Sequence, residues 1–250
     1  MGLGAQTVVE TIRSPGSLGQ AGAGQSTFRR ILRSGVHFFS YHLVLKRNRT
    51  VTSRAAGFSL RVPPTVFHPR FFRASEVFAG FIGRLDLTGR HIADVGTGSG
   101  ILALAAARAG AASVLALDIN PNAVASAAAN ARINGHGRTV SAVCSDLFSA
   151  VAPRPMFDLI LSNPPYFPGR PRDLADRAWH AGQNYRDILP IFEQARERLR
   201  PGGQFYVLLS SDSDLDYLHD LMDRARFRRA IAARYSIVIE TLLIYELTAK

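Results

Sequence analysis

The stretch LILSNPPYFPG, residues 159–169, joins a run of aliphatic side chains to a group of residues able to hold a polar ligand. Because proline has no N–H to donate to a sheet, Pro164 and Pro165 end the strand that the aliphatic run predicts. Strand termination by itself would account for an Asn-Pro pair. A stiff turn with free carbonyl oxygens, beside the amide of Asn163 and the phenol of Tyr166, indicates instead a rigid site for a ligand that donates N–H bonds.

A second group of residues lies in DVGTGSG, where Gly96, Gly98 and Gly100 follow an apolar run and Thr97 sits between them. Glycines between a strand and a helix let a ligand approach the backbone closely. Their G-x-G-x-G spacing differs from the G-x-G-x-x-G that seats the pyrophosphate of a nicotinamide dinucleotide. Asp94, two residues ahead of the first glycine, would repel a pyrophosphate and attract a cationic amino acid. This disfavours an NAD-dependent oxidoreductase, the main alternative for such a turn.

Acidic residues also end the next two predicted strands. Asp118 closes LALD, where a carboxylate can accept both hydroxyls of a ribose, and Ile119 would flank the base. The following strand ends in CSDLF, where Asp146 and Leu147 would meet the exocyclic amine and the face of an adenine. Each aspartate alone would be interpreted as a cap or a loop charge. Three acidic strand ends in successive units, one beside the glycine-rich turn, predict an adenosine site.

Such a site needs strands that end together at one edge of a sheet. From about residue 76 the sequence alternates between helical and extended patterns, which predicts βαβ units and a mainly parallel sheet covered on both faces. The predicted strands are 91–96, 113–119, 139–146, 157–163, 200–210 (after an initial turn) and those within 228–249. The predicted helices are 75–85, 99–110, 120–137 (capped by Asn120, with Pro121 at the first helical position), 186–199 and 212–226.

The bulk composition of the 250 residues is that of a globular protein, with 47% hydrophobic residues and one cysteine. A lone Cys144 cannot form an intramolecular disulfide, fits a reducing compartment such as the cytoplasm, and is predicted to be a small buried strand residue. No apolar run approaches the roughly 20 residues of a membrane helix, so no membrane partner is expected. The Arg- and Ser-containing start also resembles an organellar transit peptide, which stays open as an alternative.

Positive charge is concentrated near the N-terminus. Residues 1–75 hold eleven Lys or Arg against Glu10 alone, a net charge of +10 out of +11 for the whole chain. Contact with RNA, a ribosome or another anionic partner would explain this asymmetry, and a solvated basic arm explains it equally well. We expect residues 1–63 to be a basic extension, with about the first 27 residues flexible and 28–62 in short extended pieces that turn near 46–49, and residues 64–250 to be the main domain.

Together DVGTGSG, ALDIN, CSD and NPPY resemble the motifs of class I S-adenosylmethionine-dependent methyltransferases of the NPPY branch, which act on amide or exocyclic amino nitrogens. The resemblance implies an α/β fold, a Rossmann-like, seven-stranded, mainly parallel, doubly wound sheet with its last strand antiparallel. It implies S-adenosylmethionine as cofactor and no metal. The implied cofactor-binding residues are Asp94, Gly96, Thr97, Gly98, Gly100, Asp118, Ile119, Asp146, Leu147 and Asn163. The implied catalytic residues are Asn163, Pro164, Pro165 and Tyr166.

In that family the Asn163 side-chain oxygen and the Pro164 carbonyl accept hydrogen bonds from the NH₂ group of the target. The prolines hold these acceptors in place, and Tyr166 stacks on the planar amide or base. Hydrogen bonds from both N–H groups favour a pyramidal nitrogen whose lone pair can face the methyl group. A general base with a shifted pKa is not required, because the proton can leave after transfer.

The sequence after the tetrad NPPY (residues 163–166) resembles that of the HemK/PrmC-like glutamine methyltransferases, which modify the GGQ glutamine of translation termination factors. The matching positions are Ala178, Trp179, Ala181, Gly182, Asn184 and Arg186. This implies a protein glutamine as acceptor, and a translation termination factor as a possible partner. Residues 66–78 lack the family's acidic residue and threonine after proline, and the N-terminal extension does not resemble the bacterial helical bundle. An exocyclic amine of RNA or DNA, a small-molecule amine and a catalytically silent RNA-binding module therefore stay open.

Overall fold

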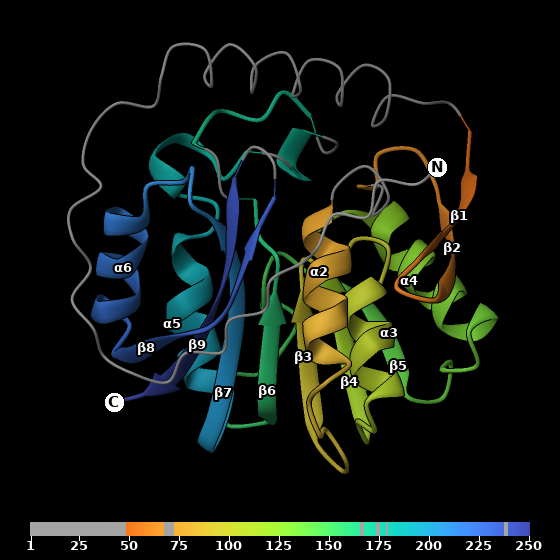
Figure 1. Cartoon of the computed structure of the whole chain (residues 1–250), viewed down its shortest axis with the longest axis horizontal. Coiled ribbons are helices and arrows are strands. Elements are labelled where there is room, and N and C mark those ends of the chain that lie inside the picture. The colour runs from red at the N-terminus through yellow and green to blue at the C-terminus, as the bar shows by residue number, and fades with distance from the viewer. Residues whose placement is uncertain (1–48, 68–72, 166–167, 174–175, 179, 238–239) are drawn as a thin grey trace.

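The computed structural model describes residues 49–67, 73–165, 168–173, 176–178, 180–237 and 240–250. Its centre is a seven-stranded sheet with the order β5-β4-β3-β6-β7-β9-β8 (Figure 1). All pairs are parallel except those of β9 with β7 and β8, so the last strand alone runs antiparallel. The predicted fold class is confirmed. The strands are β3 (His91–Val95), β4 (Ser113–Asp118), β5 (Val140–Cys144), β6 (Phe157–Ser162), β7 (Leu199–Ser210), β8 (Phe227–Ser236) and β9 (Thr241–Ala249).

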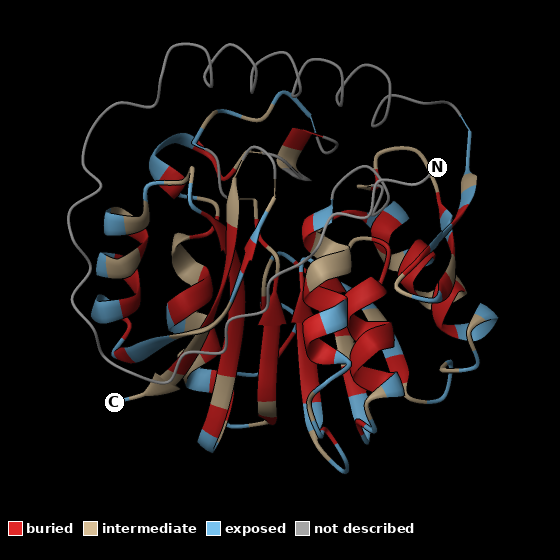
Figure 2. Cartoon of the chain, viewed as in Figure 1, coloured by how far each residue is buried: buried red, intermediate tan, exposed pale blue. Residues whose placement is uncertain are grey.

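Helices cover both faces of this sheet because alternate strand residues are apolar on each side. One core unites α2 (Arg73–Ile82), α3 (Ile101–Arg108) and α4 (Pro121–Ile133) with side chains such as Leu159 and Leu161 of β6. The other core joins α5 (Leu189–Arg198) and α6 (Leu215–Arg224) to Ile160 of the same strand. Figure 2 shows the central strands buried between these two layers.

The chain ahead of the sheet forms a hairpin, β1 (Val51–Ala55) and β2 (Phe58–Val62). Its turn lies at Ala56 and Gly57, both at positive φ, as a two-residue turn of type I′ requires. The expected turn at 46–49 lies outside the described residues apart from Arg49. The inner face of the hairpin contributes to the same core as α3 and α4, so the hairpin packs directly on the main sheet's helical layer.

Two features of the fold position the polar residues. The chain passes from β3 to β4 and β5 on one side and then returns to place β6 on the other side of β3. Ligands of parallel sheets bind at the carboxyl edge where the strand order reverses in this way. Asn120 caps α4 by accepting the backbone N–H of Asn122 at 3.0 Å, as the sequence predicts.

One sequence expectation is wrong. Cys144 is exposed, because it is the last residue of β5, the edge strand of the sheet, and its Sγ lies 3.7 Å from the Ile119 carbonyl oxygen. In the part of the chain that the structure describes, no helix combines the length and apolar character needed to cross a membrane.

Candidate active site

Asp94 is a fully buried carboxylate near the end of β3. Its Oδ2 accepts the hydroxyl of Thr97 at 2.6 Å and the backbone N–H of Ala103 at 3.1 Å. Its Oδ1 is buried and has no hydrogen-bond partner among the described residues. Burial raises the pKa of Asp94 to about 7; the bonds from Thr97 and Ala103 oppose this effect, and the charge of Asp118 adds to it. A buried acceptor without a partner is suited to a ligand that brings a cation or an N–H group.

The glycines of the following turn all have positive φ: 74° at Gly96, 54° at Gly98 and 82° at Gly100. A Cβ built at Gly96 or Gly98 would meet no heavy atom within 4 Å, so these two residues border open space. At Gly100 a Cβ would lie 3.0 Å from Cα and Cβ of Ala127, so this glycine lets α4 approach the turn. The turn therefore combines an open backbone cradle with a tight contact that fixes it.

Asp118 closes β4 and binds the glycine-rich turn to α4. Its Oδ2 accepts the N–H of Gly98 at 2.9 Å and its Oδ1 accepts the N–H of Asn120 at 2.9 Å. Burial raises the pKa of Asp118, against the effect of these two bonds. Each carboxylate oxygen keeps a further lone pair, so the side chain can still accept ligand hydroxyls. Ile119, the next residue, is half-buried.

Thr65 joins the hairpin's exit to the same corner, a contact that the sequence does not indicate. Its carbonyl oxygen and Oγ1 accept from Nδ2 of Asn120 at 3.0 and 3.1 Å, and Oγ1 also accepts from Asn122 at 3.1 Å. Thr65 has a φ of 67°, which is uncommon for a β-branched residue. Strained backbone of this kind persists where surrounding contacts hold it.

Asp146 and Leu147 follow β5 and lie next along the same edge. Asp146 is exposed, its backbone N–H donates to Ser149 Oγ at 3.2 Å, and Leu147 is half-buried with a φ of 50°. In contrast to Asp94 and Asp118, Asp146 forms no hydrogen bond with the glycine-rich turn among the described residues, so only its position after β5 places it at this edge.

Asn163 follows β6 and faces α2. Its Nδ2 donates to Ser75 Oγ at 3.0 Å, while its Oδ1 is buried without a hydrogen-bond partner in the described part of the chain. The preceding Ser162 donates from Oγ to the Val95 carbonyl oxygen at 2.9 Å, which locks β6 to β3 beside the glycine-rich turn. Pro164 is buried and Pro165 half-buried; Tyr166 lies outside the described residues.

Residues 59–237 match the family model of the methyltransferase small domain, which is well over half of the chain. The chain belongs to this methyltransferase family. No curated protein sequence matches it. Among solved structures, ribosomal protein L11 methylase from Lactobacillus delbrueckii subsp. bulgaricus is 25% identical with a TM-score of 0.55, and the match covers 74% of this chain and 83% of that one.

Two RNA-directed enzymes share the fold of this methyltransferase. A T. thermophilus 16S rRNA N2 G1207 methyltransferase in complex with AdoMet and guanosine is 23% identical, with a TM-score of 0.57 over 79% of this chain and 50% of that one. The M. jannaschii tRNA m1G37 methyltransferase is 17% identical, with a TM-score of 0.57 over 88% and 68%. This chain thus spans half the length of the first of these two structures.

S-adenosylmethionine is the cofactor of this methyltransferase, and the carboxyl edge of the sheet fits it. Asp94 Oδ1, which has no hydrogen-bond partner among the described residues, suits the cationic amino-acid part of the cofactor. The open backbone at Gly96 and Gly98 leaves space for it, and Asp118 presents acceptors to ribose hydroxyls. No group of three or more His, Cys, Asp or Glu side chains able to hold a metal ion occurs among the described residues.

Internal contacts hold the described part of residues 168–187, which follow the NPPY tetrad of this methyltransferase. Gly169 pairs with Gly182 in an isolated bridge, and the fully buried Asp176 accepts bonds from the backbone and guanidinium of Arg172. At Gly182, whose φ is 80°, a Cβ would lie 2.6 Å from Cγ of Asp187, so only glycine fits. Ala181 is buried here, whereas Trp179 lies outside the described residues.

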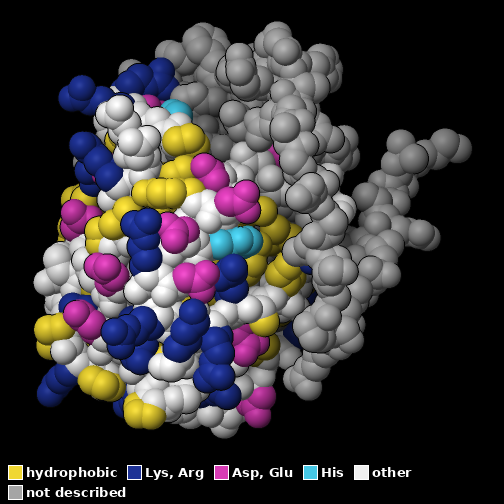
Figure 3. Space-filling view, turned by 90° about the vertical axis from the view of Figure 1, so that its left-hand side faces the viewer, with side chains coloured by type: hydrophobic (Ala, Val, Ile, Leu, Met, Phe, Trp, Pro, Cys, Tyr) yellow, Lys and Arg dark blue, Asp and Glu magenta, His cyan; other side chains and the backbone are white. Residues whose placement is uncertain are grey.

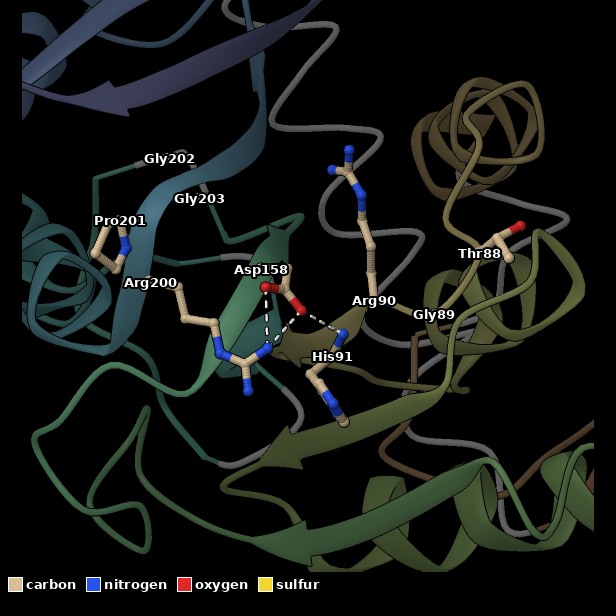
Figure 4. Close-up of a pocket in the computed structure, with 9 residues that line it drawn as sticks. All are labelled: Thr88, Gly89, Arg90, His91, Asp158, Arg200, Pro201, Gly202 and Gly203. Carbon is tan, nitrogen blue, oxygen red and sulfur yellow. Dashed lines mark hydrogen bonds and ion pairs between the residues drawn. The ribbon is translucent and has the colours of Figure 1, made fainter.

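The opposite edge of the sheet carries a cleft of about 420 Å³ that contains none of the predicted site residues. Figure 4 shows Arg200 of β7 directed at Asp158 of β6, with the backbone N–H of His91 on the other side. The distances from Arg200 Nη1 to the two carboxylate oxygens are 3.0 and 2.9 Å, and the His91 N–H donates at 2.8 Å. These bonds tie three strands together, so the arrangement explains sheet stability and not catalysis.

Proposed function

We propose that this methyltransferase N-methylates a planar NH₂ group, with the side-chain amide of a protein glutamine as the leading acceptor. The proposal depends most on Asn163: its Nδ2 is held by Ser75 and its buried Oδ1 lacks a partner within the described residues. An acceptor prepared in this way suits a donor that arrives with the substrate.

The chemistry follows from a nitrogen whose lone pair is delocalised into a carbonyl or a ring. Asn163 Oδ1 and the Pro164 carbonyl oxygen accept hydrogen bonds from the two N–H groups of this nitrogen. These bonds favour a pyramidal nitrogen with a localised lone pair. Pro164 and Pro165 limit the motion of these acceptors, so little reorganisation is needed when the reaction occurs. S-adenosylmethionine, when bound, supplies the methyl group on a sulfonium leaving group. The methylated nitrogen then loses its extra proton to solvent, and no side-chain base is required.

A protein glutamine is favoured by the residues after the tetrad. The resemblance to HemK-like enzymes includes Ala181, Gly182 and Asn184, and the structure gives Gly182 a conformation and a contact that exclude other residues. The similar ribosomal protein L11 methylase also acts on a protein, as its name states. A translation termination factor is the acceptor that this resemblance suggests.

An exocyclic amine of an RNA base is the second candidate. The net charge of +10 over residues 1–75 favours it, since phosphate groups dominate nucleic-acid affinity. The similar 16S rRNA N2 G1207 methyltransferase binds guanosine in its structure, as its name states. Asn163 and Pro164 would accept the two N–H bonds of a base as well as those of an amide.

The test is transfer of a tritiated methyl group from S-adenosylmethionine to total protein and to total RNA by the purified full chain. We expect label in protein, released as methylamine on acid hydrolysis, as an N-methylated amide requires. Asn163→Ala should lower transfer about 100- to 1,000-fold, the usual loss for a charge-stabilising hydrogen-bond group. Asn122→Ala, an exposed asparagine at the start of α4, is the matched control and should keep activity. Label in RNA alone would contradict the protein acceptor, and full activity of Asn163→Ala would contradict the role of the tetrad.

A further inference from the structure

The outer face of the β1–β2 hairpin consists of arginine and hydroxyl side chains. Thr52 pairs with Arg61 and Arg54 pairs with Ser59, so these four side chains share one face of the two-stranded ribbon. Arg54 and Arg61 are exposed, whereas the alternate residues of both strands point into the core. Guanidinium and hydroxyl groups are the donors that most often hold phosphate oxygens.

Two further arginines lie near the hairpin but are not shown to share this face. Arg49 is exposed just ahead of β1. Arg108 at the end of α3 lies at the hairpin turn, where its Nη1 donates to the Ala56 carbonyl oxygen at 3.0 Å and its guanidinium stacks on Phe58 at 4.0 Å. We call the outward side chains of Arg54 and Arg61 the hairpin arginine face.

Little negative charge offsets this face. Residues 49–67 and 119–145 contain no Asp or Glu. Glu76 is engaged with the hairpin turn, since its Oε1 accepts the N–H of Ala56 at 3.0 Å. Neither Arg54 nor Arg61 forms an ion pair within the described part of the chain. Their charges are therefore available to an anionic partner.

The backbone that carries these arginines is held rigidly by α4. Asn134 bonds both backbone groups of Ser59, at 3.0 and 2.8 Å, and Asn130 bonds both backbone groups of Arg61, at 2.7 and 3.1 Å. Ser126, one turn earlier, donates to the Arg61 carbonyl oxygen at 2.8 Å. This row of side chains along one side of α4 satisfies the free edge of β2. A fixed backbone lowers the entropy lost when a ligand binds.

The arginines on the far side of the molecule are different. Figure 3 shows basic and acidic side chains interleaved on the side that carries α6. Arg224 pairs with Asp220 at 2.7 Å, and Arg229 pairs with Asp223 at 2.6 Å. Arg224 and Arg229 can therefore serve as a control pair for Arg54 and Arg61, because acidic side chains already compensate their charges.

We propose that the hairpin arginine face binds the phosphate backbone of double-helical RNA. No aromatic or aliphatic side chain occurs among the four outward residues of the ribbon, which excludes base stacking and an apolar protein contact there. Hydroxyls between arginines suit the ribose 2′-OH and phosphate groups that line the wide, shallow minor groove of RNA. Thr65, three residues beyond β2, accepts a hydrogen bond from Asn120, so the exit of the hairpin is joined to the corner of the sheet that holds Asp118.

The experiment measures binding of the full chain to an RNA duplex of about 20 bp, longer than the roughly 16 bp that compact duplex-binding modules span. Fluorescence anisotropy over a series of salt concentrations gives affinity and salt slope. Replacing both Arg54 and Arg61 by Ala should weaken binding about tenfold or more and reduce the salt slope by about 2, one for each lost phosphate contact. Replacing both by Lys should retain part of the affinity, and replacing Arg224 and Arg229 by Ala should change nothing.

Several results would overturn the proposal. One is that the wild-type chain does not bind the duplex. Another is that the Arg54/Arg61 double variant keeps its melting temperature and binds the duplex as tightly as wild type. Equal affinity for a DNA duplex of the same sequence, or equal competition by polyglutamate, would exclude RNA as the specific partner. Methyl transfer is not a readout, so these outcomes are independent of the proposed function.

Discussion

The side-chain amide of Asn163 is held from α2, because its Nδ2 donates to Ser75 Oγ at 3.0 Å. With the nitrogen engaged, Oδ1 is fixed as the acceptor, and it is buried without a partner among the described residues. We predict that Ser75→Ala lowers kcat about 5- to 10-fold, the cost of one hydrogen bond of about 1 kcal/mol, because the amide can then rotate. The KM for S-adenosylmethionine should stay unchanged, and steady-state kinetics separate the two.

The control for this prediction is Ser53→Ala. Ser53 of β1 is also buried, and its Oγ has no partner within the described residues, so the loss of its hydroxyl should leave kcat unchanged. Ser75→Thr, which keeps a hydroxyl, should recover most of the rate. A wild-type kcat in Ser75→Ala would show that Asn163 is oriented by other contacts.

Asp94 makes the stability of the unliganded protein depend on pH. Burial raises its pKa from 3.8 to about 7, so the folded state keeps a proton that the unfolded state has lost between these values. Stability from this group is complete below pH 4 and falls by up to about 1.4 kcal/mol per pH unit as the pH rises to 7. Asp94→Asn removes the titration. The melting temperature of this variant relative to that of the wild type should therefore rise from pH 5 to pH 8.

Cofactor should reverse this trend. A cationic group beside Asp94 favours the carboxylate, so S-adenosylmethionine should stabilise wild type more at pH 8 than at pH 5 and should hardly stabilise Asp94→Asn. Thermal melts at both pH values, with and without cofactor, check both statements. If the difference between wild type and Asp94→Asn does not vary with pH, Asp94 does not titrate in this range.

The glycines of the turn allow binding and packing to be separated. Gly96→Ala and Gly100→Ala both place a side chain at positive φ, at a cost of about 1 kcal/mol. Gly100→Ala also drives a Cβ to 3.0 Å from Ala127, so it should destabilise by a further 1–3 kcal/mol or so. Gly96→Ala projects into open space and should chiefly weaken cofactor affinity.

Calorimetric titration with S-adenosylmethionine and urea denaturation test this difference. Gly100→Ala should lose more stability than Gly96→Ala. Gly96→Ala should lose more affinity for the cofactor in proportion to the stability that it loses. The reverse order would place the cofactor away from the open side of the turn.

The fold was predictable from the sequence because its signals are local. Alternation of apolar runs with helical patterns gives the βαβ order, and Asn120 followed by Pro121 marks the start of α4 through bonds two residues apart. The carboxyl-edge residues could be grouped because parallel strands end together. The exposure of Cys144 was missed, since the sequence does not state which strand lies at an edge.

The contacts that complete the site are not local and gave no sequence signal. The sequence placed Ser75 near the start of a helix, which in the structure begins at Arg73, but it gave no sign of the bond to Asn163, 88 positions away. Thr65 lies 55 positions from Asn120. Asn130, within an alanine-rich helix, shows no pattern that distinguishes it from an exposed asparagine, although it is fully buried.

Asn130 connects the hairpin to the glycine-rich turn, and its loss should be costly. Its Oδ1 accepts the Arg61 N–H at 2.7 Å, while Nδ2 lies 3.1 Å from the Arg61 carbonyl oxygen and 2.9 Å from that of Ser99. Asn130→Ala leaves three backbone groups without these partners, and we predict a loss of about 2–4 kcal/mol in the free energy of unfolding. The urea midpoint should fall with the slope unchanged.

Asn122→Ala serves as the comparison, because Asn122 is exposed and its Nδ2 makes one bond, to Thr65 Oγ1 at 3.1 Å. It should stay within about 0.5 kcal/mol of wild type. Asn130→Asp retains the acceptor for the Arg61 N–H but sets a carboxylate against two carbonyl oxygens, so it should be no more stable than Asn130→Ala. If Asn130→Ala matched Asn122→Ala, the hairpin would be held by its apolar face alone, and the bonds along α4 would contribute only its orientation.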